Sequence, residues 1–401
     1  MKDYILKIMK KYILFFAILI TIPALASENE RNIEYEDGLN FIPADSTFKV
    51  NMNLIFQPRM TVFAPADDLN SASTEYLIRR TRLRFGGWAL DPSITYFLHF
   101  AFSQQDMEST GDPSTDYPGV IFDAYIRWNF LRDAWIQFGQ FKLPANLSRQ
   151  MSFTDLNFNE RSEAEGRFTP YRDMGFMLGN EFSIANIVSR QYFAWTNGEG
   201  KNRFAASGGM AYTGRLEILP LGNFKGGGDR TEMDLENEKS PKLLVGGAIS
   251  INQDAQRSRG TLGGSLLFPV DQTTYMADIL VKYRGFAAMA EYYKREADGN
   301  PIQVNLQTGE SAIIYEGNGY SAQASYHFCG NTFALRYTST DWNELILPVV
   351  PKYEDITFGY SRHLFKNKLK LQGDLGFLRF ETPNDPVSEN LYFRLQAVLS
   401  I

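Results

Sequence analysis

The sequence is poor in the residues that build metal centres and cross-links. It holds one cysteine and three histidines in 401 residues. A single cysteine excludes an intramolecular disulfide framework and any iron–sulfur or zinc site built from several thiolates. The histidines, at positions 99, 327 and 363, are too widely spaced to suggest a multi-histidine metal centre. We therefore expect no metal and no other cofactor.

Long hydrophobic runs are also scarce. After residue 26, no stretch reaches the roughly 18 consecutive apolar residues that predict a transmembrane helix. Residues 1–26 combine four lysines, an apolar run at 12–22 and the ending Ala24-Leu25-Ala26. This order is typical of a cleaved secretory signal peptide, and the run is shorter than the ~20 residues that a membrane helix needs. We predict that residues 1–26 are removed and that the mature chain is exported.

Basic residues are fewer than acidic ones. Lys+Arg number 40 against Asp+Glu 46, a formal net charge of -6, and the predicted signal peptide carries +3, which leaves -9 for the remainder. No nucleic-acid partner is expected.

What the chain has instead is alternation. In residues 320–328 one parity is apolar (Tyr320, Ala322, Ala324, Tyr326, Phe328) and the other polar (Ser321, Gln323, Ser325, His327). Similar segments occur at 48–57, 94–103, 122–130, 274–284 and 391–401. A period of two indicates strands with one apolar face, and segments of about ten residues fit a tilted membrane crossing better than the five or six typical of globular strands. The sequence predicts an all-β, transmembrane antiparallel β-barrel over residues 47–401, preceded by a short periplasmic N-terminal segment at 27–46.

Short and long connections alternate along this pattern, as they do in outer-membrane barrels. We count 16 strands, since a closed antiparallel barrel with both ends on one side needs an even number, and leave aside a doubtful strand near 259–268. Long connections are expected at 144–172 and 253–272, among others, and a long turn at 214–241 has no assigned role. The stretch 144–172 is the third external loop, and in a barrel this wide we expect it to fold into the pore.

Basic residues concentrate in one predicted strand, Arg79-Arg80-Thr81-Arg82-Leu83-Arg84-Phe85. Arg80, Arg82 and Arg84 share one face, and arginine facing lipid costs roughly 2–4 kcal/mol near the midplane, so this face must be the lumen. Arg79 has the opposite parity and faces away unless the strand bulges or ends there. A row of guanidinium groups offers paired donors to oxyanions and favours anion entry.

Other cations extend this predicted ion pathway. The proposed pathway residues are Arg79, Arg80, Arg82, Arg84, Arg127, Lys142 and Arg161. The alternative is that the arginines pair with inward acids such as Asp123, Asp278 and Glu291 and only hold the barrel in shape. In the long loop, Arg161 and Arg172 either face the permeant ion or anchor the loop, and anchoring is favoured for Arg172, with Asp173 beside it at the strand entrance.

Several motifs occur in an order that resembles the phosphate-selective porin (porin O and P) family of Gram-negative outer membranes. They are RRTRLRFGG (79–87), DAYIRWNF and WIQFGQFKLP (123–144), NERS (159–162), RDMGF (172–176), WTNGEG (195–200), YTGRLEILPLG (212–222) and TFGYSRHLFKNKLKLQ (357–372). The resemblance implies a 16-stranded, homotrimeric porin in the cell outer membrane, with an arginine ladder and a loop-narrowed channel. Carried over by motif, Arg79, Arg80 and Arg82 fall at ladder positions.

We therefore expect a passive, water-filled diffusion channel that prefers small anions, with phosphate or polyphosphate as candidate solutes. The alternative is a general or carbohydrate-conducting porin with little ion selectivity for other small hydrophilic solutes. A plugged barrel acting as a structural protein or receptor is a further option. No histidine lies in a recognisable catalytic motif, so no enzyme is expected.

Overall fold

The computed structural model describes residues 33–35, 38–107, 119–203, 209–383 and 386–401. The predicted signal peptide, residues 1–26, lies outside these residues, as does the first part of the predicted N-terminal segment. Within the described part of the chain, none of the helices combines the length and the apolar character needed to cross a membrane.

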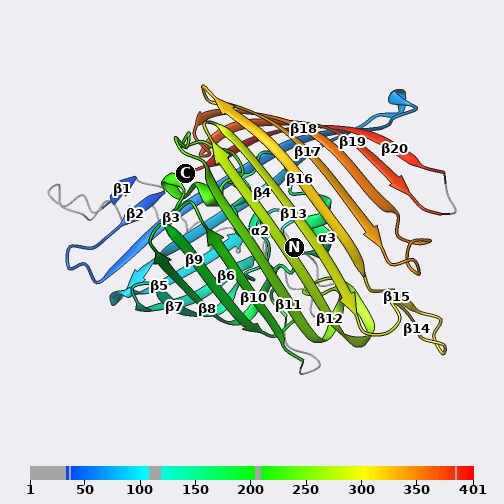
Figure 1. Cartoon of the computed structure of the whole chain (residues 1–401), viewed down its shortest axis with the longest axis horizontal. Coiled ribbons are helices and arrows are strands. Elements are labelled where there is room, and N and C mark those ends of the chain that lie inside the picture. Colours follow the sequence, from blue (N-terminus) through cyan, green and yellow to red (C-terminus); the bar gives the residue numbers. More distant parts are fainter. Residues whose placement is uncertain (1–32, 36–37, 108–118, 204–208, 384–385) are drawn as a thin grey trace, which may run out of the picture.

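Sixteen described strands form a closed antiparallel barrel, in which the last strand pairs with the first (Figure 1). They are β3 (Phe48–Pro65), β4 (Ser73–Ala89), β5 (Asp91–Ala101), β6 (Ile121–Leu131), β7 (Ala134–Lys142), β8 (Arg172–Ile184), β9 (Ile187–Thr196), β10 (Ala211–Leu219), β11 (Lys242–Arg259), β12 (Leu262–Tyr283), β13 (Phe286–Ala297), β16 (Gly317–Phe328), β17 (Asn331–Trp342), β18 (Lys352–Phe365), β19 (Leu369–Glu381) and β20 (Ser388–Ser400). The predicted all-β barrel of 16 strands is confirmed.

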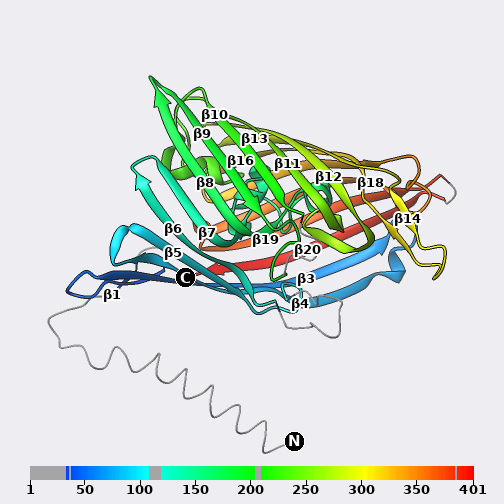
Figure 2. The same cartoon turned by 90° about the horizontal axis from the view of Figure 1, so that it is seen from below.

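Four further described strands are short and lie outside the closed ring of 16. β1 (Ile33–Tyr35) pairs with β2 (Leu39–Phe41), and β2 pairs with residues 50–52 of β3, just beyond the point where β20 ends (Figure 2). The pairing covers an edge of β3 that would otherwise present unpaired backbone groups. β14 (Ile302–Val304) and β15 (Ser311–Ile313) form a separate hairpin.

The two faces of the strands differ as the alternation predicts. In β16, Tyr320, Tyr326 and Phe328 are between 43% and 50% exposed, while Ser321 and Ser325 are buried. Large apolar side chains are exposed in the same way around the barrel, among them Phe138, Phe176 and Leu335. This arrangement puts an apolar outer surface against lipid and a polar inner surface against the lumen.

One expected connection is in fact a hairpin. β11 and β12 are joined by residues 260–261 alone, so the predicted long connection at 253–272 is wrong, and the doubtful strand near 259–268 is the end of β11 and the start of β12. Three register shifts interrupt their pairing between Asn252 and Arg259. Because each shift breaks the period-two pattern, the alternation that marks the other strands is lost here. Likewise 214–219 belongs to β10, and the long turn is 220–241.

The segment between β7 and β8, residues 143–171, carries α2 (Leu147–Gln150), the 3-10 helix η3 (Phe153–Asp155) and α3 (Glu163–Phe168). Carboxylates of distant strands accept its backbone N–H groups: Asp278 bonds Leu147 N at 3.1 Å, Glu291 bonds Ser148 N at 2.8 Å and Asp374 bonds Asn159 N at 2.8 Å. α3 contacts β13, β16 and β17. The two views show its helices within the ring of strands (Figures 1 and 2).

Apolar packing holds this segment against one part of the inner wall. Leu147, Met151, Phe153 and Leu156 form one buried cluster with side chains of β9 to β13 and with Ile55 of β3. Phe168 stacks on Trp342 of β17, with ring centroids 5.1 Å apart, in a second cluster. These clusters fill the interior next to β10–β13 and β17.

The 220–241 turn also contributes to the interior. Its Phe224 is buried in the first cluster, and the Nζ of Lys282 on β12 donates to the carbonyl oxygens of Gly228 and Met233, at 2.6 Å each. The turn meets the segment from the other barrel end, where Asn157 N donates to Glu232 at 2.6 Å. Four acidic residues of the turn, Asp229, Glu232, Asp234 and Glu238, are buried.

Replacing Lys282 by Met should loosen this turn. Lys282 Nζ bonds three oxygens, and each buried acceptor left unsatisfied costs about 1–3 kcal/mol. We expect trypsin to cut within 220–241 much faster in the folded Lys282→Met barrel than in the wild type. Lys294→Met, at a half-exposed lysine of β13, is the control. Equal cleavage rates for wild type and Lys282→Met would show that Lys282 does not hold the turn.

Candidate functional site

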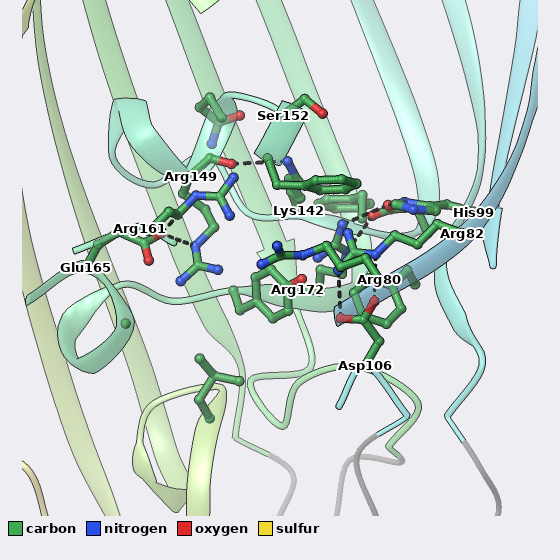
Figure 3. Close-up of a pocket in the computed structure, with 18 of the residues that line it drawn as sticks. Arg80, Arg82, His99, Asp106, Lys142, Arg149, Ser152, Arg161, Glu165 and Arg172 are labelled. Carbon is green, nitrogen blue, oxygen red and sulfur yellow. Dashed lines mark hydrogen bonds and ion pairs between the residues drawn. The ribbon is translucent and has the colours of Figure 1, made fainter. Parts of the chain in front are cut away.

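A cavity of about 750 Å³ lies inside the barrel, between the strands β3 to β8 and the 143–171 segment. Eleven arginines and Lys142 line it, against two aspartates and three glutamates. The lining therefore carries an excess of seven positive charges, although the whole chain is acidic. Figure 3 shows Arg80, Arg82 and Asp106 on the strand side and Arg149, Arg161 and Glu165 on the side of the segment.

The structure places the side chains of Arg80, Arg82 and Arg84 along the cavity, on the inner face of β4. Arg80 and Arg82 are 4% and 5% exposed, and Arg84 lies two residues further along the same face. The ring of Phe153, from η3, lies against all three guanidinium groups, whose central carbons are 4.9, 4.5 and 5.5 Å from the ring centroid. A phenyl face attracts cations, so Phe153 of the 143–171 segment stabilises the arginine column.

Arg79 joins the column through a bulge in β4. The β3–β4 register shifts so that Gln57 pairs with Arg80 and Pro58 with Ile78, which leaves Arg79 without a partner on β3. Proline has no N–H to donate to the ladder, so a bulge is readily accommodated there. Arg79 consequently lines the cavity, where its side chain bonds Glu160 and approaches Asp106 at 3.6 Å.

Two carboxylates from connections pair with this column. Asp106 bonds Arg82 at 2.7 and 2.8 Å, and Glu160 bonds Arg59 and Arg80 at 2.7 Å each. Burial alone would raise the pKa of the Asp106 carboxyl, but its hydrogen bonds and charge contact with Arg82 outweigh this and lower it. Sequence reasoning assigned neither partner. Arg59 was also missed, although it continues the polar parity of β3 beyond Gln57.

Three cations of the cavity have neutral partners. Arg84 donates to Ser152 Oγ at 3.4 Å, and Lys142 donates to two carbonyl oxygens of the 143–171 segment at 3.2 Å each. Arg127 donates to Gln137 Oε1 and lies 3.8 Å above the Trp135 ring. Among the described residues, no carboxylate lies within ion-pairing distance of these three. These three cations therefore account for much of the excess positive charge of the cavity lining.

The two predicted loop arginines lie in different surroundings. Arg161 donates to the carbonyl oxygens of Ser148 and Met151, at 3.0 and 2.8 Å, within its own segment. Arg172 is fully buried and forms a two-point pair with Asp123 of β6, at 2.8 and 3.0 Å. Asp173 accepts the backbone N–H groups of Gly198 and Gly200, so it holds the connection after β9.

The histidines do not gather into a metal site. His99 Nδ1 lies 2.8 Å from Asp123 Oδ2, next to the Arg172 pair, whereas His327 and His363 share Thr332 as a partner. In the part of the chain that the structure describes, no group of three His, Cys, Asp or Glu side chains is arranged to hold a metal ion. The cavity offers guanidinium donors, with one lysine and a few carboxylates.

The fold matches known porins. A family model described as phosphate-selective porin O and P matches residues 48–348. No curated protein sequence matches the chain.

Several solved structures share the barrel at low sequence identity. An anion-selective porin from Comamonas acidovorans is 13% identical, with a TM-score of 0.52 over 88% of this chain and 100% of that chain. The outer membrane channel DcaP of Acinetobacter baumannii is 12% identical, with a TM-score of 0.53 over 90% and 99%. Salmonella typhi OmpF, in complex with daunomycin, is 13% identical, with a TM-score of 0.51 over 92% and 100%. At these identities the likeness concerns the fold. Together with the family match over residues 48–348, it places this chain in the phosphate-selective porin O and P family of outer-membrane porins.

Proposed function

We propose that this porin is a passive, water-filled diffusion channel that prefers small anions, and that the cavity lined by β3 to β8 is its selective passage. The observation that carries the proposal is the excess of seven positive charges in the cavity lining of an otherwise acidic chain. Charges in a confined, low-dielectric passage act on a permeating ion strongly, whereas charges on the rims are screened over about 8–10 Å.

Phosphate and polyphosphate are the anions that suit this lining best. Guanidinium groups present paired, planar donors that match oxyanion geometry. Successive sites of moderate strength, first Arg80 and Arg82 and then Arg84 and Arg127, would let an anion enter and leave readily. The anion-selective Comamonas porin, which shares the fold, adds support.

The 143–171 segment narrows the channel in this proposal. Its two apolar clusters lie mainly against β9–β13 and β17, and the cavity remains open next to β3 to β8. Arg172 acts as an anchor where the segment ends, because its pair with Asp123 fixes the start of β8 to β6. Asp173 fixes the neighbouring connection.

A general or carbohydrate-conducting porin is the second candidate. Aromatic side chains line the cavity beside the cations, among them Phe97, Tyr125 and Phe122. Such rings can stack on the apolar faces of sugars. Weak ion selectivity together with block of the current by a neutral sugar would favour this candidate. No catalytic role is proposed.

We also propose that the chain is exported by the signal peptide at 1–26 and works as a homotrimer. A trimer form is described for OmpT of Vibrio cholerae, whose barrel has a TM-score of 0.50 to this one, with 11% identity over 88% of this chain and 99% of that chain.

Removing two cations that have neutral partners should lower the anion preference. In Arg84→Gln/Arg127→Gln the lining loses two of its excess charges, and no carboxylate is left without its partner. We expect the ratio of anion to cation permeability, measured as the zero-current potential in a salt gradient, to fall several-fold while the barrel stays folded. Replacing Arg80 and Arg82 is a less direct test, because Glu160 and Asp106 would lose partners.

The matched control for that variant is Lys294→Gln/Arg362→Gln, which removes two charges from exposed positions outside the cavity lining. Its permeability ratio should equal that of the wild type. An unchanged ratio in the folded Arg84/Arg127 variant would refute the assignment of the passage.

The anchoring role of Arg172 predicts a loss of stability in Arg172→Lys. Lysine keeps the charge but cannot form the two-point pair with Asp123, and we expect a loss of about 2 kcal/mol. The measurement is the temperature at which the barrel unfolds, detected as a change in its migration on a gel. Arg132→Lys, at an exposed turn, should leave that temperature unchanged. The same temperature for Arg172→Lys as for the wild type would remove Arg172 as an anchor.

A further inference from the structure

Glu160 occupies an unusual position in the cavity. Its carboxylate comes from the 143–171 segment, yet it bonds three guanidinium groups of the barrel wall, those of Arg59 on β3 and of Arg79 and Arg80 on β4. The side chains of Arg59 and Arg80 are 5% and 4% exposed, while that of Glu160 is 24% exposed. The carboxylate therefore lies on the cavity side of the arginines, where an anion in the channel would approach them.

Two of the three arginines, Arg59 and Arg80, are held in place by neutral groups other than Glu160, whereas Arg79 also approaches Asp106, at 3.6 Å. Arg80 Nη1 donates to Gln57 Oε1 at 2.9 Å. Arg59 donates to Gln396 Oε1 at 3.0 and 2.6 Å and to the carbonyl oxygen of Asn159 at 2.9 Å. The partners of Arg59 and Arg80 are neutral, so they orient these two guanidinium groups without neutralising them. Sites whose donors are held in advance bind an anion with little loss of side-chain freedom.

The backbone of Glu160 is fixed independently of its carboxylate. Arg336 of β17 donates to its carbonyl oxygen at 2.9 Å, and the preceding N–H, of Asn159, bonds Asp374 of β19 at 2.8 Å. A change at the end of the Glu160 side chain should therefore leave the segment where it is.

The charge contacts of this carboxylate are strong. Burial alone would raise the pKa of the Glu160 carboxyl, but the charges of Arg80, Arg79 and Arg59 outweigh it and hold the pKa well below its usual range. Glu160 is thus ionised at neutral pH.

We propose that Arg59, Arg79 and Arg80 form a site for one oxyanion of the phosphate or carboxylate class, and that the Glu160 carboxylate is its resident occupant. Permeating anions then meet a site that the Glu160 carboxylate already fills. Its negative charge lowers the positive charge of the site by one unit, so Glu160 limits how tightly these anions bind. The physiological meaning of this inference rests on the proposed anion channel, whereas the site itself does not.

Glu160→Gln tests the proposal, because it keeps the shape of the side chain and removes its charge. The measurement is the block of single-channel current by inorganic phosphate, titrated in a potassium chloride solution with wild-type and variant barrels. We expect the association constant for phosphate to rise about tenfold, the change that ~1.4 kcal/mol of binding free energy produces.

The control is Glu163→Gln, three residues further along the segment. Glu163 also lines the cavity, but it pairs with Arg167 of its own helix. The variant removes the same unit charge from the lining without opening the three-arginine site, and we expect phosphate block close to that of the wild type. An equal rise in both variants would mean that phosphate responds to the total charge of the cavity lining and not to the three-arginine site. The proposal would then be wrong.

Other outcomes separate the inference from the proposed function. Unchanged block in folded Glu160→Gln, with an anion-selective wild type, overturns the inference alone. Stronger block in Glu160→Gln, with a wild type that prefers cations, supports the site and overturns the anion channel. If Glu160→Gln does not fold, Glu160→Asp takes its place: the shorter carboxylate cannot reach all three arginines, and a smaller rise in phosphate block is expected. No rise there would contradict the proposal.

Discussion

The structure depends on the bonds between the charged inner wall of the barrel and the backbone of the 143–171 segment. A closed barrel of 16 strands must keep its charged side chains away from lipid, and buried charges need partners or water. Here wall carboxylates such as Asp278, Glu291 and Asp374 accept N–H groups of the segment, while Arg295 and Arg336 donate to its carbonyl oxygens. The segment, in turn, has no apolar core without the wall. The wall and the segment therefore supply each other's hydrogen-bond partners.

The contacts between the wall and the segment divide the barrel interior into two parts. Next to β10–β13 and β17, the segment and the 220–241 turn pack into apolar clusters. The charged groups there have fixed partners: Arg215 pairs with Asp278, whereas Lys282 and Arg295 donate to backbone carbonyl oxygens. Next to β3 to β8 the interior remains a cavity in which cations outnumber carboxylates. The acidic charge of the chain lies largely outside this cavity, at Asp229, Glu236 and similar positions. An acidic protein can in this way enclose a positively charged passage.

Local pattern in the sequence was sufficient for the strands and for the inward face of Arg80, Arg82 and Arg84, because a period of two assigns each residue to a face. It was not sufficient where register shifts break the period, as in β11–β12, or where a bulge turns Arg79 inward. It also gave no partner for the arginines. Glu160 lies 101 residues from Arg59, and only the folded segment brings them together. The burial of the 220–241 turn, with its many acidic residues, likewise has no local signal.

In the proposed channel the cavity, and not the net charge of the chain, sets the ion selectivity. The most direct measurement is the zero-current potential of the refolded wild-type protein in a planar bilayer under a potassium chloride gradient. We expect a potential on the anion side, although the formal net charge is -6. A potential near zero, or one on the cation side, would contradict it and leave a general or carbohydrate-conducting porin.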